Sequence, residues 1–266
     1  MLRRWWRGLR DARALRQRAI PDDLWLDTLR ALPFLTRRPL ADLLKLRALC
    51  ALFLDRKEFS GAGGLQVTDA MAVAVAAQAC LPVLHGDLGD YDGFVGIVMQ
   101  PGEVVAEREW TDDDGIVHSG TEELTGEAMA GGPLMLAWSD VAASGDSAEQ
   151  GYNVVIHEFV HVLDLRDGEA DGVPPLPSRA ARVAWLAVLE PAFQRLRNQV
   201  EAGVDTAIDP YGASGIEEYF PVVSEAFFVA PGLLHQAEPA VYDLLRGHFR
   251  QDPLRHAAAA PPRQAL

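Results

Sequence analysis

The segment that most constrains this chain is VVIHEFVHVLDLRDG, from Val154 to Gly168. Its apolar residues recur at spacings of three and four, which predicts a buried helix, yet the middle of the helix holds His157, Glu158 and His161. Residues four apart lie one above the other on a helix, so the two imidazoles face the same side. Polar groups buried in this way are costly unless a partner satisfies them.

The pattern H-E-x-x-H is typical of zinc sites in hydrolases. His157 and His161 can both reach one Zn²⁺ at roughly 2.0 to 2.1 Å. Glu158 is rotated by about 100° from the first ligand, so it reaches a water molecule rather than the metal. The alternative is a pair of core histidines satisfied by other residues. We predict a zinc site, with Glu158 as the general base.

Zinc needs a third protein ligand, and no further histidine follows at the spacing that would extend the motif. We therefore expect a carboxylate from a later helix. The candidates lie in DPYGASGIEEYFPVVSEAFF and are Glu217, Glu218 and Glu225. Glu217 can be explained as the partner of Ser214 in a capping box, so Glu218 is the predicted ligand.

Two further carboxylates have open roles. Asp164 lies seven residues after His157 on the same helix face, and it either orients an imidazole or is a surface residue near the helix end. Glu225 lies seven residues after Glu218, and it either supports a ligand from behind or forms a salt bridge near the site.

The remaining pattern predicts an α+β fold. We expect helices over 20–32, 40–53, 67–80, 183–200 and about 215–230 and 238–249, and strands over 94–99, 104–110, 116–118 and 133–141. The last strand, PLMLAWSDV, precedes the metal helix. As an edge strand it could pair with an extended peptide, and as an interior strand it could not.

We expect a helical N-terminal region over residues 1–90, packed on a catalytic domain over 91–252, with a flexible tail over 253–266. Cys50 and Cys80 are predicted to be buried free thiols, because no second pair completes a zinc or redox motif.

The charge distribution excludes some partners. A net charge of −14 argues against direct binding to nucleic acid. Residues 1–18 are an exception, with seven arginines against Asp11, and they form either a membrane-surface helix or a helix that packs its tryptophans on the body. No export signal is visible, and no apolar run reaches the length of about 18 residues that a transmembrane helix needs. These features predict a cytoplasmic protein.

HEFVHVLDLRDG, followed by DPYGASGIEEYFPVVSEAFF, resembles the bacterial Mlc titration factor A family, which comprises zinc-dependent peptidases of the gluzincin type. EREWTDDDGIVHSG and GGPLMLAWSDV extend the likeness, which covers most of residues 80–254. The resemblance implies a zincin-like fold with a small mixed sheet. It also implies that His157, His161 and Glu218 hold zinc, that Glu158 is the base, and that Tyr211 stabilises an oxyanion. From its sequence context alone, Tyr211 is a turn residue.

The resemblance further implies aminopeptidase-like hydrolysis of a peptide substrate and, as in enteric bacteria, binding of a transcriptional repressor resembling Mlc. The competing interpretation is a non-catalytic zinc protein that sequesters a regulator. A third is a helical interaction module without zinc.

Overall fold

A computed structural model describes residues 11, 13–102 and 132–257, and the backbone of residues 104–111 and 117–124. The elements in chain order are α2 (Asp22–Ala31), η1 (Pro33–Arg37), α3 (Leu40–Arg56), β1 (Glu58–Gly61), α4 (Asp69–Ala79), η2 (Leu88–Tyr91), β2 (Gly96–Gln100), β3 (Val104–Thr111), β4 (Val117–Leu124), β5 (Leu134–Ala137), α5 (Trp138–Ser147), η3 (Ala148–Gln150), α6 (Val154–Asp164), η4 (Leu165–Asp167), α7 (Arg179–Glu201), η5 (Pro210–Ala213), α8 (Ile216–Val229), α9 (Pro231–Ala237), α10 (Pro239–Phe249) and α11 (Pro253–Ala257). No helix among these residues is long and apolar enough to cross a membrane.

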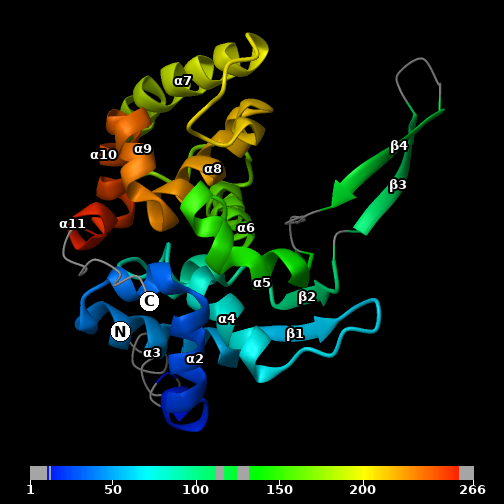
Figure 1. The fold of residues 1–266 in the computed structure, drawn as a ribbon, viewed down its shortest axis with the longest axis vertical. Coiled ribbons are helices and arrows are strands. Elements are labelled where there is room, and N and C mark those ends of the chain that lie inside the picture. Colours follow the sequence, from blue (N-terminus) through cyan, green and yellow to red (C-terminus); the bar gives the residue numbers. More distant parts are fainter. Residues whose placement is uncertain (1–10, 12, 103, 112–116, 125–131, 258–266) are drawn as a thin grey trace, which may run out of the picture.

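The sheet has three parallel strands in the order β1, β2, β5. The predicted mixed sheet is therefore wrong for the described residues. Strands β3 and β4 pair with each other as a separate antiparallel hairpin, which stands away from the helical body (Figure 1). Parallel neighbours need long crossovers, and α4 lies within the connection between β1 and β2.

The predicted strand over 133–141 is shorter than expected. β5 ends at Ala137, which is opposite Gln100 at the end of β2. Pro101 follows, and a proline cannot donate to a continued ladder. The chain turns into helix α5 at Trp138 instead.

Helix α6 lies between the N-terminal elements and α8 (Figure 1). On one side, the ring of Phe159 lies 5.0 Å from that of Tyr91 and 5.5 Å from that of Phe53, centroid to centroid. On the other side, His157 faces α8. One hydrophobic core thus includes residues from both sides of position 90, and the domain division there remains a prediction.

The predicted N-terminal helices are confirmed as α2, α3 and α4, and Cys50 and Cys80 are buried and free. Helix α6 begins where the side chain of Asn153 accepts the Ile156 N–H at 3.0 Å. The predicted tail begins with α11. Residues 258–266 and most of the arginine-rich start lie outside the described residues.

A tight loop follows α6 and packs against α8. Gly172 has a φ of +72°, and a Cβ added there would lie 2.5 Å from the Ile216 carbonyl oxygen. Its N–H donates to Asp164 at 2.9 Å, which fixes the loop to the end of helix α6.

Gly172→Ala is expected to lower the free energy of unfolding by at least about 2 kcal/mol, because left-handed strain adds to a clash with backbone. The control is Gly168→Ala, since Gly168 has a φ of +97° and no atom within 4 Å of the added Cβ. That variant should lose only about 1 kcal/mol, from strain alone. Urea denaturation measures both. Equal losses would contradict the close approach to Ile216.

Candidate metal centre

Three side-chain atoms from α6 and α8 meet at one point. The Nε2 atoms of His157 and His161 lie 3.1 Å apart. The Oε2 atom of Glu218 lies 3.1 Å from the first and 3.2 Å from the second. These are the three predicted ligands, and the structure brings them together as the His-His-Glu group able to hold a metal ion among the described residues.

The size of this triangle fits a zinc ion. A tetrahedral site with metal–ligand distances of about 2.0 to 2.1 Å has edges of about 3.3 to 3.4 Å. The observed edges of 3.1 to 3.2 Å are close to that value. Hydrogen bonds alone satisfy these three atoms poorly. Each has a lone pair directed at the same point, and a proton placed between two of them leaves the third without a partner. His157 and His161 together with Glu218 thus have the donor types and the spacing of a three-ligand zinc site.

Electrostatics in the metal-free site tie these groups to each other. Burial disfavours a charged imidazole, but the carboxylates of Glu225 and Glu218 outweigh it and raise the pKa of His157 to about 10. Burial also raises the pKa of a carboxyl, yet hydrogen bonds from His157 and His161 lower the pKa of Glu218 to about 2. Without metal, the site therefore holds a proton on His157.

Zinc binding at pH 8 is expected to release about one proton, because a metal-ligating nitrogen cannot keep it. Calorimetry in two buffers of different ionisation enthalpy measures the release. The raised pKa of His157 also stabilises the metal-free fold. This contribution is complete below pH 6.5, the ordinary pKa of histidine, and is lost as the pH rises through about 10. Zinc binding without proton release at pH 8 would show that His157 is neutral in the metal-free protein.

Glu158 lies next to the triangle and is buried, with 3% of its surface exposed. Its Oε2 atom has no hydrogen-bond partner within the described part of the chain. Burial raises the pKa of this carboxyl, although His157 and His161 oppose the shift. A buried carboxylate oxygen without a partner is costly, and a water molecule beside a metal ion would satisfy it.

Behind the ligands lies a buried polar chain that links three helices. The Nδ1 atom of His157 lies 2.7 Å from Oε1 of Glu225, whose Oε2 accepts the backbone N–H of Asn153. The Asn153 side chain donates to Oε1 of Gln78 at 2.7 Å, and Gln78 donates to the Ala74 carbonyl in α4 at 3.0 Å. Glu225 is thus placed to hold the Nδ1 proton and leave Nε2 of His157 for a metal.

Glu225→Gln is expected to lower zinc affinity by about 10- to 100-fold. In one orientation the new amide N–H₂ faces the Asn153 N–H, so that two donors oppose each other. In the other it faces Nδ1 of His157 and forces the proton onto Nε2, which blocks the metal. Competition with a chromogenic chelator measures the affinity.

The matched control is Glu217→Gln, which removes the same charge from the same helix without a contact to a ligand. It should leave the affinity within about twofold. Similar losses in both variants would mean that net charge, and not the orientation of His157, sets the effect of Glu225.

The other predicted residues have mixed outcomes. Asp164 is fully buried, but it accepts the Gly172 N–H rather than a hydrogen from a ligand ring, and no described residue partners its Oδ1. Burial raises the pKa of Asp164 to about 6, against the effect of that N–H. It therefore anchors the loop. Tyr211 lies in the turn η5, as its sequence suggests, and its ring lies 5.9 Å from that of His157 between centroids.

The capping box predicted at Ser214 is wrong. Gly215 is the N-cap of α8 and makes no side-chain cap, while the Ser214 hydroxyl donates to the Tyr211 carbonyl at 2.7 Å. The Ser214 hydroxyl thus hydrogen-bonds within turn η5 instead of capping helix α8. Glu218 nevertheless reaches the metal position from the first turn of α8.

Sequence reasoning missed Asn153 and Gln78. Asn153 carries a usable signal, since an asparagine directly before an apolar helical run predicts an N-cap. Gln78 is a single polar residue in the alanine-rich α4, and its only sequence signal is that it interrupts an apolar run.

Comparison with known proteins gives a consistent picture. A profile of the family described as glucose-regulated metallo-peptidase M90 matches residues 3–250. Mlc titration factor A of Pectobacterium atrosepticum is 40% identical over 213 residues, which is 79% of each chain. The protein of the same name from Serratia proteamaculans is 38% identical over 233 residues, covering 86% of this chain and 87% of its own. That of Salmonella arizonae is 34% identical over 235 residues, covering 87% and 92%.

Proposed function

Since this chain belongs to the glucose-regulated metallo-peptidase M90 family, among relatives named Mlc titration factor A, we propose that it is a zinc-dependent, aminopeptidase-like peptidase. The observation that carries the proposal is the triangle of two imidazole nitrogens and one carboxylate oxygen beside the unpartnered Oε2 of Glu158. A structural zinc site has four protein ligands, whereas three ligands leave a position for substrate.

His157, His161 and Glu218 would hold the zinc ion. When bound, zinc supplies Lewis acidity, which makes a water molecule more acidic and a peptide carbonyl more electrophilic. Glu225 keeps the ring of His157 in the orientation that presents Nε2. The protein therefore contributes a site whose ligands are fixed before the ion arrives.

Glu158 is the general base of the proposal. Its carboxylate takes a proton from the attacking water and then delivers that proton to the leaving amine. Its burial supports this role, because a raised pKa makes the Glu158 carboxylate a stronger base towards the attacking water than an exposed carboxylate.

Tyr211 is the proposed oxyanion donor. Its ring lies beside His157, and 54% of its surface is exposed, so the phenol can approach a substrate carbonyl. The Asp209 side chain accepts the Tyr211 N–H at 2.9 Å and stabilises the turn that carries it. A preorganised O–H donor at this position stabilises negative charge that develops in the transition state.

β5 is the proposed track for the substrate backbone. Within the described part of the chain it pairs on one side only, with β2, so its other edge is available to an extended peptide. β5 also contacts α6, which brings a peptide bound there towards the metal helix.

Binding of a regulator is the second candidate function, and the relatives' name favours it. Proteins named Mlc titration factor A at 34 to 40% identity support an interaction with a transcriptional repressor resembling Mlc. The alternative from the sequence, a zinc protein that only sequesters a regulator, leaves the unpartnered Glu158 without a role. The cytoplasmic location is part of the proposal.

Digestion of a peptide library and of aminoacyl p-nitroanilides tests the proposal. Cleavage should stop when 1,10-phenanthroline removes zinc and return when zinc is added. Cleavage that persists in zinc-depleted protein would rule out the mechanism. A zinc-loaded protein that binds a repressor but cleaves nothing would favour the sequestering alternative.

A further inference from the structure

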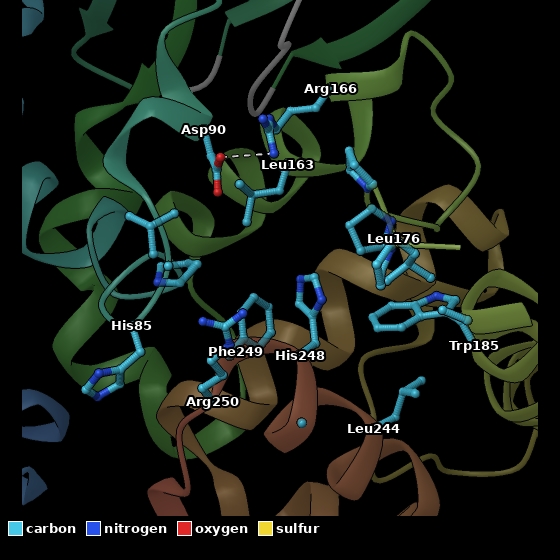
Figure 2. A pocket seen from close by; sticks show the side chains of 18 of the residues that line it. His85, Asp90, Leu163, Arg166, Leu176, Trp185, Leu244, His248, Phe249 and Arg250 are labelled. Carbon is cyan, nitrogen blue, oxygen red and sulfur yellow. Dashed lines mark ion pairs between the residues drawn. The ribbon is translucent and has the colours of Figure 1, made fainter. Parts of the chain in front are cut away.

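A second concave site lies apart from the metal centre. It is a cleft of about 600 Å³ between the end of α6, the loop 174–177, α7 and the end of α10. None of the three proposed zinc ligands lines it, and neither does Glu158. Figure 2 shows His248 and Phe249 rising into it from α10, opposite Leu163 and the Asp90–Arg166 pair.

We propose that this cleft binds a small organic acid, a monocarboxylate with an apolar body, whose carboxylate pairs with Arg250 and hydrogen-bonds to His248. The apolar body would lie against Trp185 and Leu176. The inference does not depend on the proposed peptidase activity.

The charges of the cleft leave one cation available. Asp90 pairs with Arg166 at 3.0 Å. Asp243 pairs at 2.9 Å with Arg246, which does not line the cleft. Arg250 has no carboxylate within 4.0 Å among the described residues, although the whole chain carries a net charge of −14. The guanidinium of Arg250 is exposed at the cleft, so it can pair with an anion from outside.

The backbone holds Arg250 in an unusual conformation. It is the C-cap of α10 with a φ of +54°, and among the described residues it is the one non-glycine with a positive φ. Glycine is the usual residue at such a position, because a Cβ is strained there. Strain of this kind is often found at binding sites, and here it directs a guanidinium to the cleft (Figure 2).

His248 provides a neutral hydrogen-bonding group beside that cation. Its ring packs against Trp185 at 5.2 Å and Phe249 at 4.8 Å between centroids. Burial, together with Arg250, lowers its pKa to about 4, so it is uncharged at neutral pH. No hydrogen-bond partner of its ring lies among the described residues. A carboxylate that bridges Arg250 and the His248 N–H would satisfy both groups.

The walls fix the class of the ligand. Trp185 is 2% exposed and its indole N–H is already bonded to the Gly172 carbonyl at 2.9 Å, so the part of the ring that lines the cleft offers no polar group. Leu163, Leu176 and the prolines 174, 175 and 177 complete an apolar surface that suits a ring-sized body.

Calorimetry with 4-phenylbutyrate on the zinc-loaded full chain tests the proposal. The probe should bind, and both the uncharged 4-phenylbutyramide and acetate, which lacks the apolar body, should bind at least about tenfold more weakly. Arg250→Gln should weaken binding of the acid about tenfold, and His248→Phe, which keeps a ring, several-fold. Arg255→Gln is the matched control, since Arg255 is exposed, lies outside the lining and has no ion pair with any described residue, and it should bind like the wild type.

Carboxylates also bind zinc, so the titration is repeated after zinc removal. Unchanged affinity supports the cleft, and loss of binding would assign the probe to the metal centre and overturn the proposal. Equal affinity for acid and amide, equal effects of Arg250→Gln and Arg255→Gln, or no binding of the acid at millimolar concentration would overturn it as well. Circular dichroism verifies that each variant is folded.

Discussion

Glu158→Gln is expected to lower kcat for peptide hydrolysis by about 10²- to 10⁴-fold while the protein keeps its zinc. The substitution is nearly isosteric, so it leaves the positions of His157 and His161 unchanged. Among the described residues it removes the carboxylate beside the triangle that is not already engaged, because Glu218 is a proposed metal ligand and Glu225 is hydrogen-bonded to His157. Glutamine has no basic oxygen for this step.

The measurement is a set of initial rates with aminoacyl p-nitroanilides, together with zinc content by plasma emission. Glu190→Gln is the control, since Glu190 is exposed on α7 and loses the same charge. It should retain full activity. If Glu158→Gln keeps both zinc and wild-type rates, Glu158 is not the base. If it loses zinc, the residue is a ligand and the geometry of the triangle has been misassigned.

Glu218→Gln has the second large effect, on zinc itself. We expect zinc affinity to fall by more than 100-fold, beyond the loss that outer residues such as Glu225 cause. A neutral amide oxygen replaces the single anionic ligand of the site, and the charge that balances the metal is lost. Hydrolysis should fall in parallel and recover only in part with excess zinc.

Chelator competition and activity at a series of zinc concentrations measure this effect. Glu217→Gln, one position earlier in the same turn, is again the control and should bind zinc like the wild type. Unchanged zinc affinity in Glu218→Gln would show that another group completes the site, and the edges of the triangle would need a different explanation.

The ligands were accessible from sequence because their geometry is local. His157 and His161 lie one helical turn apart, and the turn of the helix alone brings their Nε2 atoms within 3.1 Å. Glu218 followed from the need for a third ligand and from assigning Glu217 to a capping box with Ser214, so the choice was made by an argument that the structure does not bear out. The cap at Ser214 failed because a nearer carbonyl, that of Tyr211, takes the hydroxyl.

The hydrogen-bond chain behind the ligands could not be predicted from the sequence, because it depends on contacts between distant segments. Gln78 and Asn153 are 75 positions apart, and no spacing links them. Sheet pairing has the same difficulty: the apolar pattern predicts strands β2 and β5, but pairing depends on the path of the chain between them. The cleft is a further case, since Arg250 and Trp185 come together only when α7 and α10 pack.

The most direct test of the central claim is zinc K-edge X-ray absorption on the purified chain, combined with the zinc-to-protein ratio. We expect one zinc per chain with two imidazole nitrogens at about 2.0 to 2.1 Å and the remaining ligands oxygen. The Glu158→Gln variant should give the same first shell. Substoichiometric zinc, sulfur in the first shell, or a single imidazole would contradict a site made by His157, His161 and Glu218.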